Sequence, residues 1–179
     1  LAVKEILAFH KGNIDTRLHF IFPDDKERVV TVADELRIKP SDEVLKVTVS
    51  SLRANLEATL SNPALLPQSQ KQLDELSSHP QFTDCLVYVL AHLTSEPLQL
   101  RQLAGLLAKN NVRKMCKSLK KEQRAFDFIH SAAVHALRDE NKVVRDTASS
   151  IVTTCVEFDG IWPGLVESLF SLASATDSV

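Results

Sequence analysis

Apolar residues recur along the chain with the spacing of helices. Between residues 42 and 60 they fall on one helical face, at Leu45, Val49, Leu52, Leu56 and Leu60. Ser41 directly precedes this segment and is a typical N-cap residue, while Asp42 and Glu43 place acids where the helix dipole favours them. The pattern therefore predicts an amphipathic helix over residues 42–60.

The helical periodicity continues toward the C-terminus, interrupted by breaks that contain proline. Pro63 and Pro67 lie in "SNPALLP", where the missing backbone donors end the first helix, and Pro80 ends a short second helix within "QSQKQLDELSSHP". Further helices are expected over residues 81–94, 97–115, 121–138, 141–157 and 162–175. Short connections between them predict a series of antiparallel hairpins and an all-α fold.

Two of these hairpins share a motif. The segments "TSEPLQLRQLAG" and "LRDENKVVRDTASS" contain the same spacing of an apolar residue, an arginine and an alanine. The arginines, Arg101 and Arg145, lie 44 residues apart, within the range of about 40 to 47 expected for paired-helix repeats of the HEAT and armadillo kind. A third apolar helical run begins at Trp162. We therefore expect an α-solenoid of about three and a half HEAT-type helical hairpins.

The repeated arginines predict a polar ladder between hairpins. Each lies at the start of a second helix, from which a guanidinium can reach the preceding turn and the same turn of the neighbouring hairpin. Asp139 is the acid of the later turn, whereas Ser95 takes its place in the earlier one. We expect Asp139, Arg145 and Arg101 to form this ladder, with a gap at the earlier turn.

Composition agrees with a well-packed helical protein. Of 179 residues, 44% are hydrophobic and only four are glycine, which favours helices and a sizeable core. No run approaches the roughly 18 apolar residues of a membrane span, and no signal-peptide pattern opens the chain. Cys85, Cys116 and Cys155 form no CxxC pair, which suits a reducing compartment. The expected location is cytosol or nucleus, with the cysteines acting as small buried side chains.

The sequence contains no motif for catalysis or metal binding. The six histidines form no HExxH motif or Cys/His cluster, and His130 and His135 point to different sides of a helix. There is no P-loop or GxGxxG motif either. We expect no catalytic residue, metal or cofactor, so an enzyme is the least favoured class, and a nucleotide would arrive only on a partner.

Basic residues cluster between positions 101 and 124. Only one acid, Glu122, lies among them, although the whole chain has a net charge of −2. The cluster comprises Arg101, Lys109, Arg113, Lys114, Lys117, Lys120, Lys121 and Arg124. It is either a solvated helix end or a surface for an acidic partner. Nucleic acid is a weaker alternative because aromatic residues do not interleave the basic ones.

Several stretches resemble the N-terminal HEAT repeats of the importin-β (karyopherin-β) nuclear transport receptors, and of their transportin branch in particular. Residues 77–114, "SSHPQFTDCLVYVLAHLTSEPLQLRQLAGLLAKNNVRK", resemble the first and second repeats, and "AGLLAKNNVRK" is the most specific part. Residues 128–174 continue the match, with "WPGLVESL" resembling the start of the fourth repeat.

The resemblance implies a transport-receptor fragment that shuttles between cytoplasm and nucleus. In the family, second helices of the first repeats bind the small GTPase Ran in its GTP form, which is linked to cargo release at distant repeats. The matching positions are Lys109 and Asn110, with Arg113 and Lys114 close behind. Cargo and nucleoporins would bind through later repeats, which this chain does not contain. The alternative is a HEAT-repeat scaffold or adaptor without a transport role.

The two ends of the chain depart from the repeat pattern. Residues 1–40 contain the helix-like "LAVKEILAFHKG" and a hairpin-like alternation, and are expected to be an unassigned extension preceding a HEAT-repeat region over residues 41–179. At the other end, the last helix has no second helix to cover it. Leu165, Leu169 and Leu172 therefore predict an exposed apolar stripe that promotes self-association through residues 162–175.

Overall fold

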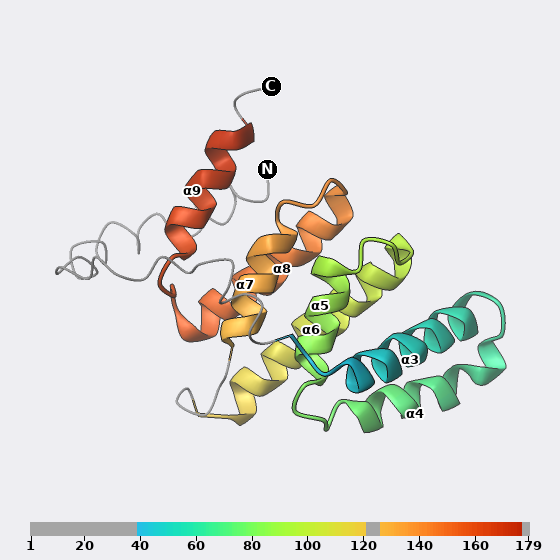
Figure 1. Cartoon of the computed structure of the whole chain (residues 1–179). Helices are drawn as coiled ribbons and strands as arrows, with labels where there is room; N and C mark the ends of the chain where they lie inside the picture. The colour runs from blue at the N-terminus through green and yellow to red at the C-terminus, as the bar shows by residue number, and fades with distance from the viewer. Residues whose placement is uncertain (1–38, 121–125, 177–179) are drawn as a thin grey trace.

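The computed structural model describes residues 39–120 and 126–176, and this part of the chain is helical (Figure 1). The elements are α3 (Asp42–Leu60), the 3₁₀ helix η2 (Pro63–Leu65), α4 (Leu66–Leu76), α5 (Phe82–His92), α6 (Leu98–Ser118), α7 (Asp127–Ala136), α8 (Lys142–Asp159) and α9 (Leu165–Thr176). The all-α prediction is confirmed. The helix-like and hairpin-like segments expected before residue 39 lie outside the described residues.

Helix boundaries follow local signals closely in some places and less so in others. α3 spans the predicted residues, and the Ser41 hydroxyl accepts a hydrogen bond from the Val44 amide at 3.4 Å. The break after α3 is shorter than expected, because Pro67 lies in the first turn of α4. Backbone N–H groups in the first turn have no partner within the helix, so a proline there costs no hydrogen bond. α6 continues to Ser118, three residues beyond its predicted end at 115.

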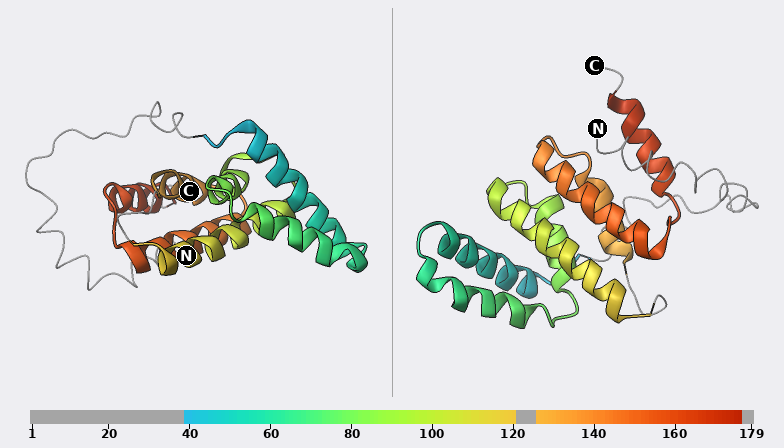
Figure 2. Two further views of the ribbon diagram at one scale, coloured as in Figure 1. Left: turned by 90° about the horizontal axis from the view of Figure 1, so that it is seen from below. Right: turned by 180° about the vertical axis from the view of Figure 1, so that it is seen from behind.

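The helices stack as consecutive antiparallel pairs in two layers. Figure 2 shows α5, α7 and α9 in one layer and α6 and α8 in the other. Within the pairs, α5 packs on α6 and α7 on α8; between the pairs, α5 packs along α7 and α6 along α8. α3 pairs with α4 and also contacts α5 and α6. The predicted α-solenoid of HEAT-type hairpins is confirmed.

A continuous hydrophobic core runs between the two layers. Its largest fully buried side chains include Leu52, Leu86, Leu90, Ile129 and Ile151, which come from successive hairpins. The predicted apolar face of α3 is buried at Leu45 and Leu52, but Leu60 is 71% exposed. The C-terminal end of α3 projects away from α5 (Figure 1). Leu60 therefore lies on the apolar face of α3, as its spacing predicts, but beyond the part of that face that the neighbouring helices cover.

The expected apolar stripe on α9 is wrong. Leu165 and Leu169 are each 2% exposed, and Leu172 is partly buried against the core. α9 continues the layer of α5 and α7 at the C-terminal end of the stack (Figure 2), and this face of the helix belongs to the common core. Phe170 is the exposed large side chain of the helix instead. The basis for self-association through the leucines is therefore lost.

The two histidines of α7 pack as rings on different neighbours. His130 stacks on Trp162 with ring centroids 3.8 Å apart and an interplanar angle of 3°, while His135 stacks on His92 of α5 at 4.7 Å. Burial lowers the pKa of His130 to about 4, although Asp127 and Asp159 act in the opposite direction. His130 is therefore a neutral packing ring at neutral pH.

Gly105 allows α6 and α8 to approach closely. A Cβ atom at this position would lie 2.4 Å from Thr147 Cγ2 and 3.1 Å from the side chain of Leu90. The first distance is far below a normal contact between carbon atoms. Glycine is unfavourable inside a helix, but the close packing of α6 on α8 requires it at position 105.

Gly105→Ala is expected to lower the free energy of unfolding by about 1 to 3 kcal/mol in urea denaturation, because overpacking outweighs the gain in helix propensity. Thr147→Ser removes the clashing methyl group and keeps the hydroxyl that donates to the Val143 carbonyl at 2.7 Å. The cost of Gly105→Ala should therefore shrink in the Thr147→Ser background. An equal cost in both backgrounds would show that Thr147 is not what requires glycine here.

Candidate interaction surface on the second helices

The C-terminal half of α6 forms an open, basic surface. Asn110, Arg113, Lys114, Lys117 and Ser118 line a hollow of about 400 Å³. Their spacing of three and four residues places them on one side of the helix. The structure therefore brings three of the four residues chosen from the sequence, at positions 110, 113 and 114, into one hollow. The fourth, Lys109, is half-buried on the same helix and lies outside this lining.

Arg101 does not belong to this basic surface, although it begins the charge cluster in the sequence. Its side chain is buried, with the residue only 5% exposed. Its Nε and Nη2 donate to the Leu90 carbonyl oxygen at 3.0 and 2.6 Å, and Nη2 also lies 2.5 Å from Asp139 Oδ2. The end of the cluster at Lys121 and Arg124 lies outside the described residues. The described basic surface therefore consists of the α6 cations from Lys109 onward.

An acid from the neighbouring second helix meets this surface. Arg113 Nη2 lies 4.0 Å from Glu157 Oε2 on α8, and the two side chains are 49% and 54% exposed. An ion pair this exposed and this long contributes less than about 1 kcal/mol. Arg113 therefore remains available to an external carboxylate. Leu106, one turn before Asn110, adds an exposed apolar side chain that charge-based sequence reasoning missed.

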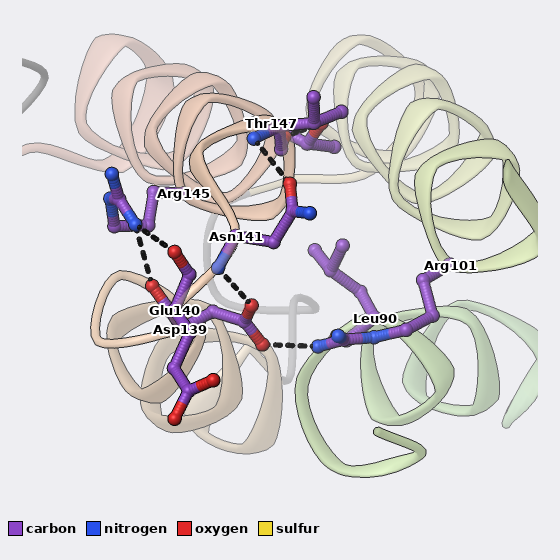
Figure 3. A network of polar contacts seen from close by, with 8 residues as sticks. Leu90, Arg101, Asp139, Glu140, Asn141, Arg145 and Thr147 are labelled. Atoms are coloured by element: carbon purple, nitrogen blue, oxygen red, sulfur yellow. Dashed lines mark hydrogen bonds and ion pairs between the residues drawn. The ribbon is translucent and has the colours of Figure 1, made fainter. Parts of the chain in front are cut away.

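Figure 3 shows the polar network that joins the two central hairpins. Arg101 in α6 links the Leu90 carbonyl of its own hairpin to the Asp139 carboxylate in the α7–α8 turn. Asp139 Oδ1 accepts a hydrogen bond from the Asn141 amide at 2.8 Å. Arg145 Nη1 donates to the carbonyl oxygens of Asp139 and Glu140, both at 2.8 Å. The three residues expected to form the ladder thus meet at one turn.

The electrostatics of this turn favour an ionised Asp139. Burial alone would raise the pKa of Asp139, but the hydrogen bonds from Arg101 and Asn141 and the charges of Arg101 and Arg145 hold it below its ordinary value. The carboxylate is consequently a charged acceptor at neutral pH. It ties the α7–α8 turn to the preceding hairpin through a charge-assisted bond.

The preceding turn has an acid that the sequence analysis did not identify. Arg53 Nη2 of α3 lies 2.6 Å from Glu96 Oε1, and Arg53 Nε donates to Glu96 Oε2 at 3.3 Å. Glu96 thus supplies the acid that was expected to be missing at Ser95. Its basic partner lies in the middle of a first helix, whereas Arg101 lies near the start of a second helix, so the repeat spacing did not reveal the pair.

Metal ligands and nucleophiles are the other groups in the described segments that could carry out chemistry. No three His, Cys, Asp or Glu side chains gather there as a possible metal site. Cys85, Cys116 and Cys155 are buried, and burial raises the pKa of Cys85 to about 11 and that of Cys155 to about 12. Those two thiols stay protonated at neutral pH and are poor nucleophiles. None of the helices between residues 39 and 176 that the structure describes is long and apolar enough to cross a membrane.

The stacked hairpins and their inter-hairpin polar bonds define an α-solenoid of HEAT type with a basic surface on one second helix. Residues 69–139 match the family described as the importin-beta N-terminal domain. The chain contains this domain, and most of the chain is distantly homologous to a part of transportin-1. The resemblance found in the sequence is confirmed.

Transportin-1 of Homo sapiens and that of Mus musculus are each 28% identical to the chain over 145 residues, which cover 80% of this chain and 16% of the relative. Importin subunit beta-2 of Schizosaccharomyces pombe is 27% identical over 108 residues, or 59% of this chain and 12% of that protein. The chain thus spans about one sixth of the transportin-1 proteins that it matches.

The matched domain covers the basic surface. Residues 69–139 contain α5 and α6 entirely, and therefore the five described residues that line the hollow, and they end at Asp139. In importin-β receptors this domain is the region that binds Ran-GTP. Receptors of this family are not enzymes, which agrees with a sequence that lacks catalytic motifs.

Proposed function

We propose that this chain is the Ran-binding part of a transportin-like nuclear transport receptor, and that it binds Ran in its GTP form through α6. The observation that carries the proposal is the open basic hollow of α6, which lies inside the importin-β N-terminal domain match. Such a surface steers an acidic partner and orients it during docking.

Lys109, Asn110, Arg113 and Lys114 are the proposed Ran-binding residues. Asn110, Arg113 and Lys114 are exposed in the hollow, so their polar groups can reach a partner without rearrangement of the helix. Lys109 is half-buried, and its long side chain would extend its ammonium group to the edge of the contact. Leu106 offers an apolar contact at the same edge.

Binding at α6 would be linked to cargo release elsewhere in the receptor. The Arg53–Glu96 and Arg101–Asp139 pairs connect successive hairpins, which gives a physical route by which a shift of one hairpin alters the next. Coupling of this kind is reciprocal, so cargo and Ran-GTP would weaken each other's binding. Cargo and nucleoporins would contact other repeats of the receptor, residues 1–40 would form an extension to the HEAT region over 41–179, and the protein would shuttle between cytoplasm and nucleus.

The proposal is tested by nucleotide dependence. The purified chain is titrated with Ran loaded either with a non-hydrolysable GTP analogue or with GDP, in isothermal calorimetry at two salt concentrations. We expect an affinity of about 1 μM or tighter for the GTP form, weaker binding at higher salt, and no measurable binding of the GDP form. Equal binding of the two forms would overturn the transport-receptor proposal.

A HEAT-repeat scaffold or adaptor without a transport role is the second candidate. The inter-hairpin pairs at Glu96 and Asp139 fit this candidate as well, because they stabilise a stack of hairpins regardless of what the stack binds. A scaffold of this kind would use the α6 surface for an acidic partner without reading a nucleotide. The same titration therefore separates the two candidates.

A further inference from the structure

The basic surface of α6 is not repeated on the next second helix. Glu157 of α8 follows Arg113 by 44 residues, which is also the offset between Arg101 and Arg145 at the starts of these two helices. Glu157 and Arg113 are therefore equivalent positions of adjacent hairpins with opposite charge. The charge of the second-helix layer changes sign between α6 and α8.

The equivalents of the other cations of the basic surface are uncharged. At the same offset, Lys109 corresponds to Thr153, Lys114 to Phe158, and Lys117 to Ile161, which follows the end of α8. Glu157 is thus the charged member of this set on α8. Asp159, two residues later, carries a charge that acts to raise the pKa of His130 on α7.

Glu157 is placed to interact with the α6 surface directly. Its carboxylate lies 4.0 Å from the Arg113 guanidinium, and both side chains are about half exposed. Among Lys109, Arg113, Lys114 and Lys117, Arg113 alone has a carboxylate within 4.0 Å in the segments that the structure describes. Glu157 therefore partly neutralises the central cation of the surface and adds a negative charge at its α8 side.

We propose that Glu157 is a specificity-determining residue of the α6 surface. It competes with the carboxylates of an acidic partner for Arg113, and it repels a partner whose acidic patch extends over α8. A partner then binds well only when its acidic groups face α6 and end before α8. This inference rests on the proposed function, because it describes how the surface proposed for Ran-GTP selects the position in which its partner binds across α6 and α8.

Glu157→Gln is the direct test, with Ran bound to a GTP analogue as the probe. The variant should bind about two- to fivefold more tightly than the wild-type chain at low salt, as expected for removal of one exposed opposing charge. The gain should disappear in about 0.5 M salt, where charges are screened over a few ångströms. Glu167→Gln on α9 is the matched control, since it makes the same charge change on an exposed residue of another helix and should bind like wild type.

A second background identifies the cation through which Glu157 acts. If Glu157 competes for Arg113, most of the gain from Glu157→Gln should be lost when both chains carry Arg113→Gln. An unchanged or weaker affinity of Glu157→Gln would overturn the inference. An equal gain in the Arg113→Gln background would overturn its first part, the competition for Arg113, and would assign the effect to repulsion between Glu157 and the partner. Failure of the wild-type chain to distinguish GTP-bound from GDP-bound Ran would instead overturn the proposed function, so the two failures are distinguishable.

Discussion

Arg101→Ala is expected to lower the free energy of unfolding by about 3 to 5 kcal/mol, which is the usual cost of removing one partner from a buried ion pair. The Arg101 and Asp139 side chains are 7% and 11% exposed. The substitution would leave the Asp139 carboxylate without its cation and remove both donors to the Leu90 carbonyl. Urea denaturation at pH 7, followed by circular dichroism at 222 nm, measures the change.

Two further alanine variants calibrate this result. Arg145→Ala should cost about 1.5 to 3 kcal/mol, because within the described residues its guanidinium hydrogen-bonds to two carbonyl oxygens of the turn and to no carboxylate. Lys142→Ala should change stability by no more than about 0.5 kcal/mol, because its ion pair with Asp146 is exposed. If Arg101→Ala costs no more than Lys142→Ala, the proposed role of the buried pair in joining the hairpins is wrong.

A double variant separates the unpaired charge from the lost contacts. Arg101→Met with Asp139→Asn fills most of the buried volume and removes the uncompensated carboxylate, while the carboxamide oxygen introduced at position 139 could still accept from the Asn141 amide. This variant should be more stable than Arg101→Ala, because the penalty for an unpaired buried charge is gone. If Arg101→Ala does not fold, the stability of this double variant can still be compared with that of the wild-type chain.

Reversing Lys109 and Arg113 to glutamate is expected to weaken binding of Ran-GTP by about 2 kcal/mol or more. The change replaces two cations of α6 with anions, and one of these would lie beside Glu157. Both positions are on a helix surface and outside the fully buried core, so the helical fold should persist. Calorimetry with the GTP-analogue form of Ran gives the affinity, and circular dichroism checks the helix content.

The control for this reversal changes the same number of charges elsewhere. Lys46 on α3 and Lys71 on α4 are exposed, so their double reversal to glutamate alters the net charge equally without touching α6. The control should retain most of the wild-type affinity. If the α6 reversal binds unchanged, or if the control loses as much, the assignment of the Ran site to these residues fails. This effect is also opposite in sign to the gain expected from Glu157→Gln.

Local interactions account for what the sequence by itself determined. The start of α3 is set by the Ser41 cap, and its extent follows from apolar spacing. The 44-residue offset between Arg101 and Arg145 indicated a repeat before any contact was known, and the resemblance to importin-β receptors followed from contiguous segments. The cap and the apolar spacing depend on residues near one another in the chain, and the repeat and the resemblance depend on comparing stretches of sequence, so all of them can be recognised without coordinates.

The tertiary structure alone decided which residues of each face are buried and which charges reach solvent. Arg101 and Arg113 belong to one basic stretch, yet the first is enclosed by Leu90 and Asp139 and the second lines an open hollow. Leu60 and Leu169 both fall on apolar faces, yet the first is exposed and the second is buried. Periodicity assigns a residue to a side of its own helix, but its burial and its electrostatic partners depend on neighbouring helices packed against that side, often about 40 residues away in the chain.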